Sequence, residues 1–258
     1  MGDEARLSLA PAQRRPSASD IKACDLDVVF QPIVSVDGGS LYALEALCRC
    51  KWPEFRNPQL LFEQAVVERC CGQLGRSVRD VAFERVQNTP LFINLHPHEL
   101  SEHWLVRPDD PVCFHDTEVF LEITESAAFS YYDLCLNVLK EVCSRTGAHL
   151  VIDDFGAGYS NLKRIVDLEP DIVKLDLALV RGIDKSRRQQ TLVKHVVRLC
   201  EDLGARVVAE GIETTPELEA VIDCGVHFGQ GYLLAKPAFP VPEAHWPLAP
   251  RAAGCEAV

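Results

Sequence analysis

Two adjacent carboxylates, Asp153 and Asp154, end an apolar run and are followed by Gly156 and Gly158 in the segment LVIDDFGAGYSNL. Successive side chains of a strand point to opposite faces, so both carboxylates can serve one site only where the strand ends and its backbone turns. The glycines indicate such a turn. An acidic pair there suits divalent cations, which prefer oxygen ligands. The segment alone is equally consistent with a strand-to-loop junction, in which Asp153 caps a turn and Asp154 is solvated.

Polar residues also recur late in the other apolar runs, at the positions where a barrel enzyme places its chemistry. They are Gln31, Glu45, Arg49, Asn94, Glu122, Lys174, Glu210 and Gln230. Any one of them has an ordinary explanation, such as an edge position or a satisfied polar group in the core. Several acids together at one barrel mouth have no such ordinary explanation, because an ionised group is costly to bury unless it is paired or binds a metal. Together they predict a functional site.

The candidate ligands at this site all offer oxygen. They are Glu45, Asn94, Glu122, Asp153 and Asp154. A donor set without His or Cys favours Mg²⁺ or Mn²⁺ over Zn²⁺, and two such ions about 3.5 to 4 Å apart form the usual clamp for phosphoester cleavage. In that setting Lys174 can position the attacking water or stabilise charge in the transition state. Glu210 can accept a proton or orient water.

Eight β-like runs, separated for the most part by amphipathic helical patterns, must position these residues. The runs are DVVFQPIVSV, YALEALCRC, PLFINL, VFLEIT, AHLVIDDF, DIVKLD, RVVAEGI and HFGQGYLL. Eight strands alternating with helices over about 230 residues predict an α/β fold, a modified (β/α)8 TIM-like barrel, with a doubly wound open sheet as the alternative. The short Asp37-Gly38-Gly39 turn between the first two runs is typical of a hairpin. One strand near the N-terminus is therefore expected to be antiparallel to its neighbours.

Helices are expected over residues 59–86, as two helices broken near Gly72 to Gly75, and over residues 132–145, 187–203 and 216–224. Composition divides the whole chain into three segments. Residues 1–24 lack apolar periodicity and are expected to be flexible, residues 25–240 form the barrel domain, and residues 241–258 form a tail rich in Pro and Ala.

Charge and cysteine usage narrow the possible partners and compartment. The net charge is -12 and the basic residues are dispersed, which argues against binding to DNA or an anionic membrane. The 11 cysteines are odd in number and include no Cys-x-x-Cys pair, and no secretory signal precedes them. They are interpreted as reduced thiols of a cytoplasmic protein, mostly buried, although Cys48 with Cys50 or Cys70 with Cys71 could bind a soft metal. No run approaches the ~18 apolar residues of a membrane span.

Eight short motifs occur in order at compatible spacing. They are QPI at 31–33, EAL at 45–47, Asn94 in FINL, EITE at 122–125, DDFG at 153–156, KLD at 174–176, AEGIE at 209–213 and QGY at 230–232. Together they resemble the EAL-domain family, phosphodiesterases of cyclic di-GMP, from about Phe30 to Pro237. The resemblance implies a modified barrel that hydrolyses cyclic di-GMP to linear 5'-pGpG with two Mg²⁺ or Mn²⁺ ions per active site. It also implies a homodimer.

The resemblance further implies roles for single residues. Ligands of the first metal are expected at Glu45, Asn94, Glu122 and Asp153, and a ligand of the second at Asp154. The pair that positions water and handles protons falls on Lys174 and Glu210. Substrate contacts fall on Gln31, Leu47, Arg49 and Gln230. Glu125 matches a residue that anchors the loop after Asp154, which in the family links the metal site to the dimer interface.

The chain departs from the family's pattern at a few positions outside the metal ligands. His96 stands where Ser is usual, Ala157 where Thr is usual, and Leu177-Ala178 where Arg-Ser is common, and Cys50 to Leu61 also differs. These changes bear on loop order, dimer coupling and substrate affinity more than on chemistry. His96 is a candidate extra ligand, although a position behind the ligands or on the surface is favoured.

Because no ligand or catalytic Glu is lost, an active phosphodiesterase is the favoured function. The alternative is a catalytically weak or inactive EAL protein that acts as a cyclic di-GMP receptor or a protein-binding regulator. Hydrolysis of pGpG or another phosphodiester stays open, as does an unidentified regulatory protein partner.

Overall fold

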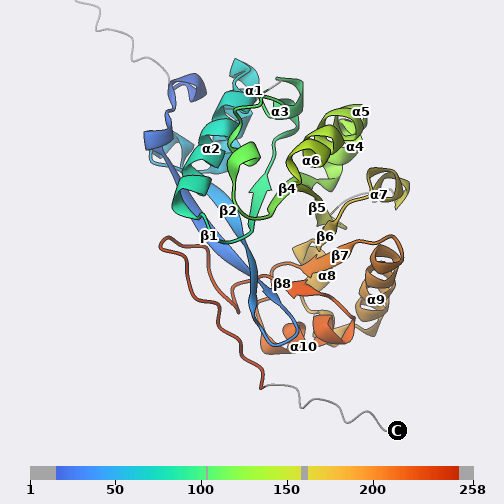
Figure 1. Ribbon diagram of the computed structural model, residues 1–258. Coiled ribbons are helices and arrows are strands. Elements are labelled where there is room, and N and C mark those ends of the chain that lie inside the picture. The colour runs from blue at the N-terminus through green and yellow to red at the C-terminus, as the bar shows by residue number, and fades with distance from the viewer. Residues whose placement is uncertain (1–15, 103, 158–161, 250–258) are drawn as a thin grey trace, which may run out of the picture.

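The computed structural model describes residues 16–102, 104–157 and 162–249. Its eight strands close into a barrel in chain order (Figure 1). They are β1 (Leu26–Ser35), β2 (Leu41–Cys50), β3 (Leu91–Asn94), β4 (Val119–Thr124), β5 (His149–Phe155), β6 (Ile172–Leu175), β7 (Arg206–Ala209) and β8 (Phe228–Gly229). β1 is antiparallel to β2 and to β8, and the other six pairings are parallel. The predicted barrel with one antiparallel strand is confirmed, and the open-sheet alternative is wrong.

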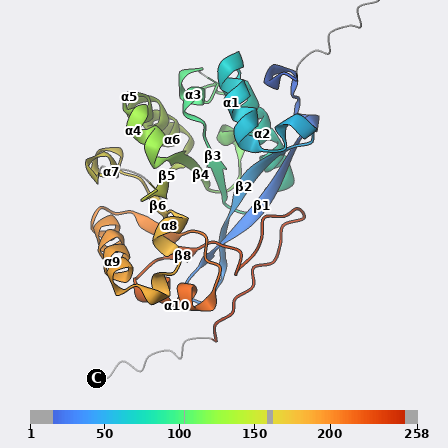
Figure 2. The same ribbon diagram turned by 180° about the vertical axis from the view of Figure 1, so that it is seen from behind.

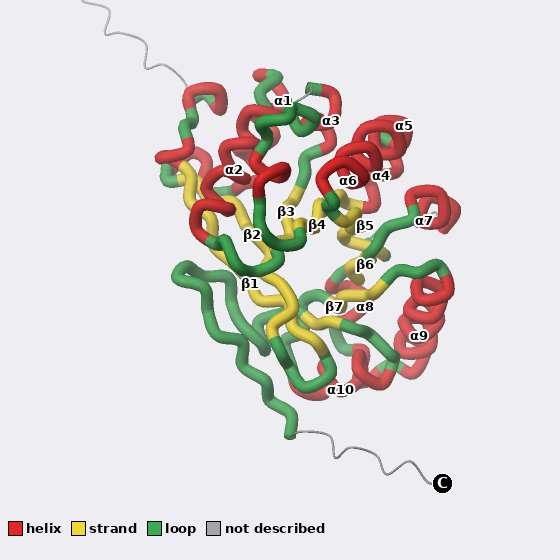
Figure 3. The backbone as a smooth tube through the Cα atoms, viewed as in Figure 1, coloured by secondary structure: helices red, strands yellow, loops and turns green. Residues whose placement is uncertain are grey.

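Helices lie around the strands, as the view from behind (Figure 2) and the view from the front (Figure 3) show. The longer ones are α1 (Pro58–Glu68), α2 (Cys71–Arg85), α9 (Arg187–Asp202) and α10 (Thr215–Asp223). The shorter ones are α3 (Pro97–Ser101), α4 (Glu125–Ser130), α5 (Tyr132–Leu134), α6 (Lys140–Thr146), α7 (Leu162–Leu168) and α8 (Leu177–Val180). A π-helical turn, η5 (Cys135–Leu139), joins α5 to α6, and 3₁₀ turns form η1 (Ala18–Asp20), η2 (Ala23–Asp25), η3 (Pro53–Phe55), η4 (Pro111–Phe114) and η6 (Ile183–Lys185). None of the helices in the described ranges is long and apolar enough to cross a membrane.

The break between the first two helices lies before the glycines and not at them, so the predicted position was wrong. α1 ends at Arg69, whose backbone is left-handed with a φ of 57°. Gly72 and Gly75 lie inside α2, where an added Cβ would come within 2.4 Å of Trp104 Cδ1 and 2.0 Å of Glu99 Oε2 respectively. The glycines therefore allow a distant segment to pack closely on α2, and they do not end a helix.

Six of the site residues, on or directly after β2 to β7, each follow an apolar residue two positions earlier, which is the spacing of residues on one face of a strand. The apolar members of these pairs are Ala43, Phe92, Phe120, Val151, Ile172 and Val208, and they belong to one buried cluster that also contains Ile33 and Phe228. The barrel interior is consequently apolar toward the amino ends of these strands and polar at their carboxyl ends. This layering supports the polar mouth on a packed base.

Both ends of the described chain pack on the barrel domain. Ser17 Oγ donates to Glu68 Oε2 of α1 at 2.6 Å, so the described end of the segment expected to be flexible contacts the body. In the tail, His245 N donates to Leu234 O at 2.8 Å, and Trp246 covers Gly39. Residues 1–15 and 250–258 of the two end segments lie outside the described residues, and the boundaries after residues 24 and 240 stay predictions.

Candidate active site

The predicted site residues meet at the carboxyl ends of the parallel strands. Six of them are buried, with at most 8% of the surface of each exposed: Gln31, Glu45, Glu122, Asp153, Lys174 and Gln230. Asp154 and Glu210 are partly exposed, and Asn94 is exposed at the end of β3. The site therefore has a buried base and a rim open to solvent.

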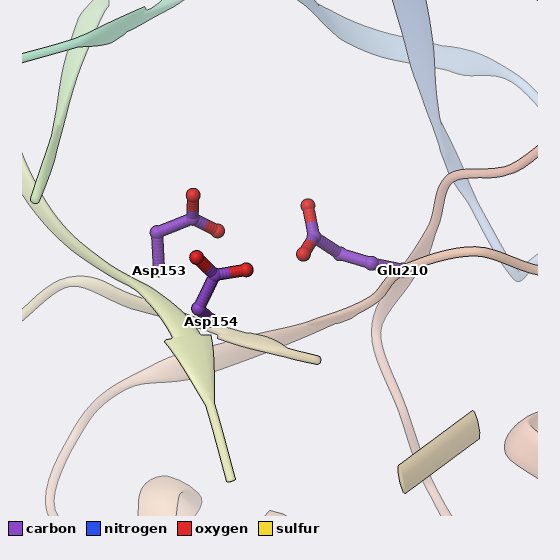
Figure 4. Close-up of side chains that lie close together, drawn as sticks. All are labelled: Asp153, Asp154 and Glu210. Carbon is purple, nitrogen blue, oxygen red and sulfur yellow. The ribbon is translucent and has the colours of Figure 1, made fainter. Parts of the chain in front are cut away.

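A bulge in β5 brings Asp153 and Asp154 to the same side. The pairing of β5 with β6 shifts register between Ile152 and Phe155, and Asp154 has a left-handed backbone with a φ of 55°. Oxygen atoms of Asp153, Asp154 and Glu210 all lie within 4.8 Å of one another (Figure 4). The predicted turn is present, but the strand resumes after it and continues to Phe155. Asp tolerates the left-handed conformation better than most residues, which explains how this geometry is accommodated without glycine.

Lys174 lies at the centre of the acids. Its Nζ is 2.7 Å from Glu122 Oε1, 2.7 Å from Glu210 Oε1, 3.3 Å from Asp153 Oδ1 and 3.7 Å from Glu45 Oε1. The side chain is fully buried, and these ion pairs lack hydrogen-bond geometry. One ammonium thus faces four carboxylates, and a net negative charge is left in a buried space.

Glu45 is held by two side-chain amides, one at the end of β3 and one directly after β8. Asn94 Nδ2 donates to its Oε1 at 2.9 Å, and Gln230 Nε2 donates to its Oε2 at 2.5 Å. Gln230 also donates to Gln31 Oε1 at 3.1 Å, and Gln31 in turn donates to Ala235 O at 2.9 Å. Asn94 uses its amide nitrogen for Glu45, so its carbonyl oxygen is the atom that a cation would take.

The electrostatics of the site follow from this excess of acid. Burial raises the pKa of Glu210 to about 8 and, together with the charge of Asp153, raises the pKa of Asp154 to about 6. Burial likewise raises the pKa of Glu122 well above its ordinary value despite Lys174. Burial also opposes ionisation of Glu45, but Lys174 and the neighbouring amides outweigh it and lower its pKa. Shifts of this kind in a cleft are typical of functional sites.

The residues present fit a divalent cation site. Both oxygens of Glu122 and Oδ1 of Asp153 are buried and accept no hydrogen bond. Hard cations prefer carboxylate and amide oxygen, which are the atoms gathered here. Among the residues the structure describes, Asp153, Asp154 and Glu210 form a cluster able to hold an ion, and neither cysteine pair is part of such a cluster. The soft-metal interpretation of the cysteines therefore finds no support there.

A pocket of about 720 Å³ adjoins the acids and is lined by five of the predicted residues, Glu45, Leu47, Arg49, Asn94 and Asp154. Arg49 itself donates to Cys48 O at 2.8 Å. The pocket is also lined by residues that the sequence did not single out, among them Phe62 of α1. An aromatic residue in an amphipathic helix is usually core, so local patterning offers no signal for it. α1 is the first α-helix after β2, and that order would have placed Phe62 near this end of the barrel.

Glu125 and His96 lie beside the site without forming part of the acid cluster. Glu125 Oε2 accepts from Gly156 N at 3.2 Å, which ties α4 to the backbone just after the β5 bulge. Of the loop that follows, residues 158–161 lie outside the described part of the chain. His96 Nδ1 accepts from His98 N at 3.3 Å, and its ring stacks on Phe62 at 5.8 Å between centroids. His96 thus has a capping and stacking role in this structure.

We expect the melting temperature to fall by a few degrees between pH 4.5 and 8 when divalent cations are absent. Glu210 and Asp154 have folded pKa values of about 8 and about 6, above the ordinary 4.5 and 3.8, so the folded protein holds more protons than the unfolded chain in this range. Stability present below the unfolded pKa is lost as the pH rises through the folded one. Mn²⁺ should raise the melting temperature, and by more at pH 8, because it binds the deprotonated carboxylates. Thermal scans with Mn²⁺ or with EDTA measure both effects.

Glu210→Gln should show a smaller fall with pH, since the substituted side chain does not titrate. Glu213→Gln is the matched control, because Glu213 lies nearby but pairs with Arg181 in an exposed contact. A melting temperature of the unsubstituted protein that changes neither with pH between 4.5 and 8 nor on addition of Mn²⁺ would contradict the proposed clustering of acids.

Comparison with known proteins places the chain in a family. A family model described as the EAL domain matches residues 14–237. The cyclic di-GMP phosphodiesterase RocR of Pseudomonas aeruginosa is 30% identical over 248 residues, which cover 90% of this chain and 62% of that protein. The cyclic di-GMP phosphodiesterase PdeR of Escherichia coli is 31% identical over 234 residues, covering 86% of this chain and 35% of that protein. The chain thus spans less than two thirds of the length of these curated relatives.

Solved structures agree in fold. A manganese and cy-diGMP complex of Klebsiella pneumoniae BlrP1 has a TM-score of 0.72 and 32% identity, over 83% of this chain and 56% of that chain. A c-di-GMP complex of the PaMucR phosphodiesterase has a TM-score of 0.73 and 27% identity, over 83% of this chain and 92% of that chain. Since the family model alone covers most of the sequence, the chain belongs to the EAL domain family.

Proposed function

We propose that this protein hydrolyses cyclic di-GMP to linear 5'-pGpG, with two Mg²⁺ or Mn²⁺ ions in the active site. The observation that carries the proposal is the cluster of four carboxylates around one buried lysine, with Asp154 beside it and a pocket of about 720 Å³ adjoining. The named activities of RocR and PdeR and the nucleotide in the BlrP1 complex support the choice of substrate.

Charge supports the need for metal. The chain carries a net charge of -12, and its site adds several acids at the point where an anionic phosphodiester must bind. Bound divalent ions supply the opposite charge, activate water and polarise the phosphate. Glu45, Asn94, Glu122 and Asp153 are proposed to hold the first ion, and Asp154 is proposed to be the main protein ligand of the second. Either Mg²⁺ or Mn²⁺ suits this oxygen donor set.

The chain's own residues then have separate tasks. Lys174 contacts Glu210 at 2.7 Å, so the ammonium can orient the attacking water while the carboxylate receives its proton. Burial raises the pKa of Glu210 to about 8, so without metal its carboxyl holds a proton at neutral pH, and nearby cations would favour the ionised form that can accept one. Leu47 and Arg49 line the pocket and are proposed to contact the nucleotide, with the guanidinium on a phosphate oxygen. Gln31 and Gln230 are proposed as further nucleotide contacts.

The deciding experiment is chromatography of cyclic di-GMP after incubation with the purified protein and Mg²⁺ or Mn²⁺, with EDTA as the control. We expect pGpG to accumulate with metal and not with EDTA. Binding of cyclic di-GMP without pGpG under either metal would overturn hydrolysis and favour the alternative, a receptor or protein-binding regulator. Linear pGpG supplied as the starting material tests whether it too is consumed.

The oligomeric state, the cellular location and a protein partner are also proposed, on the basis of the family resemblance. We propose a homodimer, with Glu125 linking the loop after Asp154 to the interface through its bond to Gly156. A cytoplasmic location and a regulatory protein partner are proposed with it. Light scattering of the purified chain, with and without cyclic di-GMP, measures the dimer directly.

A further inference from the structure

A fully buried arginine lies behind the wall of the active-site pocket. Arg79 of α2 is 0% exposed and donates to two carboxylates that are also 0% exposed, Glu99 of α3 and Asp110 before η4. Its Nη1 lies 2.7 Å from Glu99 Oε2, while Nε and Nη2 lie 3.1 and 2.9 Å from the two oxygens of Asp110. These partners follow Arg79 by 20 and 31 residues, so the network joins three separate parts of the chain.

Glu99 connects this network to the active site through a second hydrogen bond. Its second oxygen, Oε1, accepts from His96 N at 3.0 Å, so one carboxylate holds the arginine on one side and the turn after β3 on the other. His96 lies two residues after Asn94, and both line the pocket. The turn is also fixed by Leu95 N, which donates to Glu122 O at 2.9 Å.

The packing around Glu99 leaves little room for movement. A Cβ on Gly75 would lie 2.0 Å from Glu99 Oε2, so α2 and α3 approach each other as closely as glycine permits. Asn94, in contrast, is exposed, and its side chain is oriented by the bond to Glu45 and by the backbone from which it projects. The position of that backbone is set by the turn that Glu99 holds.

We infer that Glu99, which Arg79 holds from the other side, is a positioning residue that fixes the turn after β3 so that Asn94 can serve the metal site. This inference rests on the proposed function for its metal. A salt bridge that is fully buried is weak evidence of stabilisation by itself, because desolvation offsets much of the attraction. Residues behind metal ligands are known to hold them in orientation, and their loss typically weakens metal binding 10- to 100-fold.

Glu99→Gln tests the inference, and Asp110→Asn is its matched control. Each acid accepts from Arg79 and from one backbone N–H, those of His96 and Val112 respectively, and an amide has a single oxygen for these donors. Both variants should lower the melting temperature. Only Glu99→Gln should weaken Mn²⁺ binding in calorimetry, by about tenfold, and speed amide hydrogen exchange in residues 94–99.

Equal weakening of Mn²⁺ binding by Asp110→Asn would overturn the inference, since the network would then act only through overall stability. Unchanged Mn²⁺ affinity in Glu99→Gln would overturn it as well. If the unsubstituted protein binds no Mn²⁺, the proposed function fails instead. The exchange pattern, which is measured without metal, then decides whether Glu99 holds the turn.

Discussion

Glu45→Ala is expected to reduce metal-dependent turnover of cyclic di-GMP about 10³-fold or more. Glu45 is 7% exposed, accepts hydrogen bonds from Asn94 and Gln230, and lies 3.7 Å from Lys174 Nζ. Its removal takes away a proposed metal ligand and leaves two amide donors without their acceptor. The measurement is pGpG formation over a Mn²⁺ titration, paired with calorimetric Mn²⁺ binding to show that the lost rate follows the lost ion.

Glu217→Ala is the control for that experiment, because Glu217 is another buried acid that accepts several hydrogen bonds. It lies on α10 and accepts from the backbone N–H groups of Gly182, Glu213 and Thr214. Its loss should cost about 1 to 3 kcal/mol of stability while leaving Mn²⁺ affinity unchanged. Wild-type Mn²⁺ dependence in Glu45→Ala would remove Glu45 from the metal site.

Much of this site could be predicted from the sequence because chemistry and strand periodicity point the same way. Polar residues such as Glu122 and Lys174 stand two positions after apolar ones, so the pattern itself placed them at the polar end of the barrel. The antiparallel strand followed from the short turn near Gly38. These features are local, and local sequence therefore predicts them.

Other features depend on contacts between distant residues and have no local signal. Gly72 and Gly75 suggested a helix break, yet they lie inside α2 because Trp104 and Glu99 pack on them. Arg79 would pass for an ordinary exposed residue of an amphipathic helix, and only the fold shows that it is fully buried. The distances around Lys174 likewise result from barrel closure.

The β5 bulge shows where sequence and structure complement each other. Two neighbouring acids required a turn in the strand, and the left-handed backbone of Asp154 provides it. The turn gives the two acids different surroundings, since Asp153 is buried beside Lys174 while Asp154 is partly exposed at the pocket. This asymmetry supports the proposal that they serve different ions. It also places Gly156, which Glu125 holds, directly after the second acid.

Glu210→Gln is expected to lower kcat about 10²- to 10⁴-fold while cyclic di-GMP binding is retained. The amide is nearly the same size as the carboxylate, whose Oε1 lies 2.7 Å from Lys174 Nζ. The amide oxygen can therefore keep this contact with Lys174. It cannot accept a proton from water, and the chemical step is lost while the pocket stays intact. Single-turnover kinetics and the Kd for cyclic di-GMP, measured with Ca²⁺ in place of Mn²⁺, separate the two quantities.

Glu213→Gln serves again as the matched control, because it removes a nearby charge that pairs with Arg181 on the surface and does not contact Lys174. It should retain both kcat and Kd. A rise in Kd with kcat preserved in Glu210→Gln would make Glu210 a binding residue and not a proton acceptor. Near-normal turnover and binding together would mean that another acid of the cluster takes the proton, and Asp153, which lies 3.3 Å from Lys174 Nζ, would be the next carboxylate to substitute.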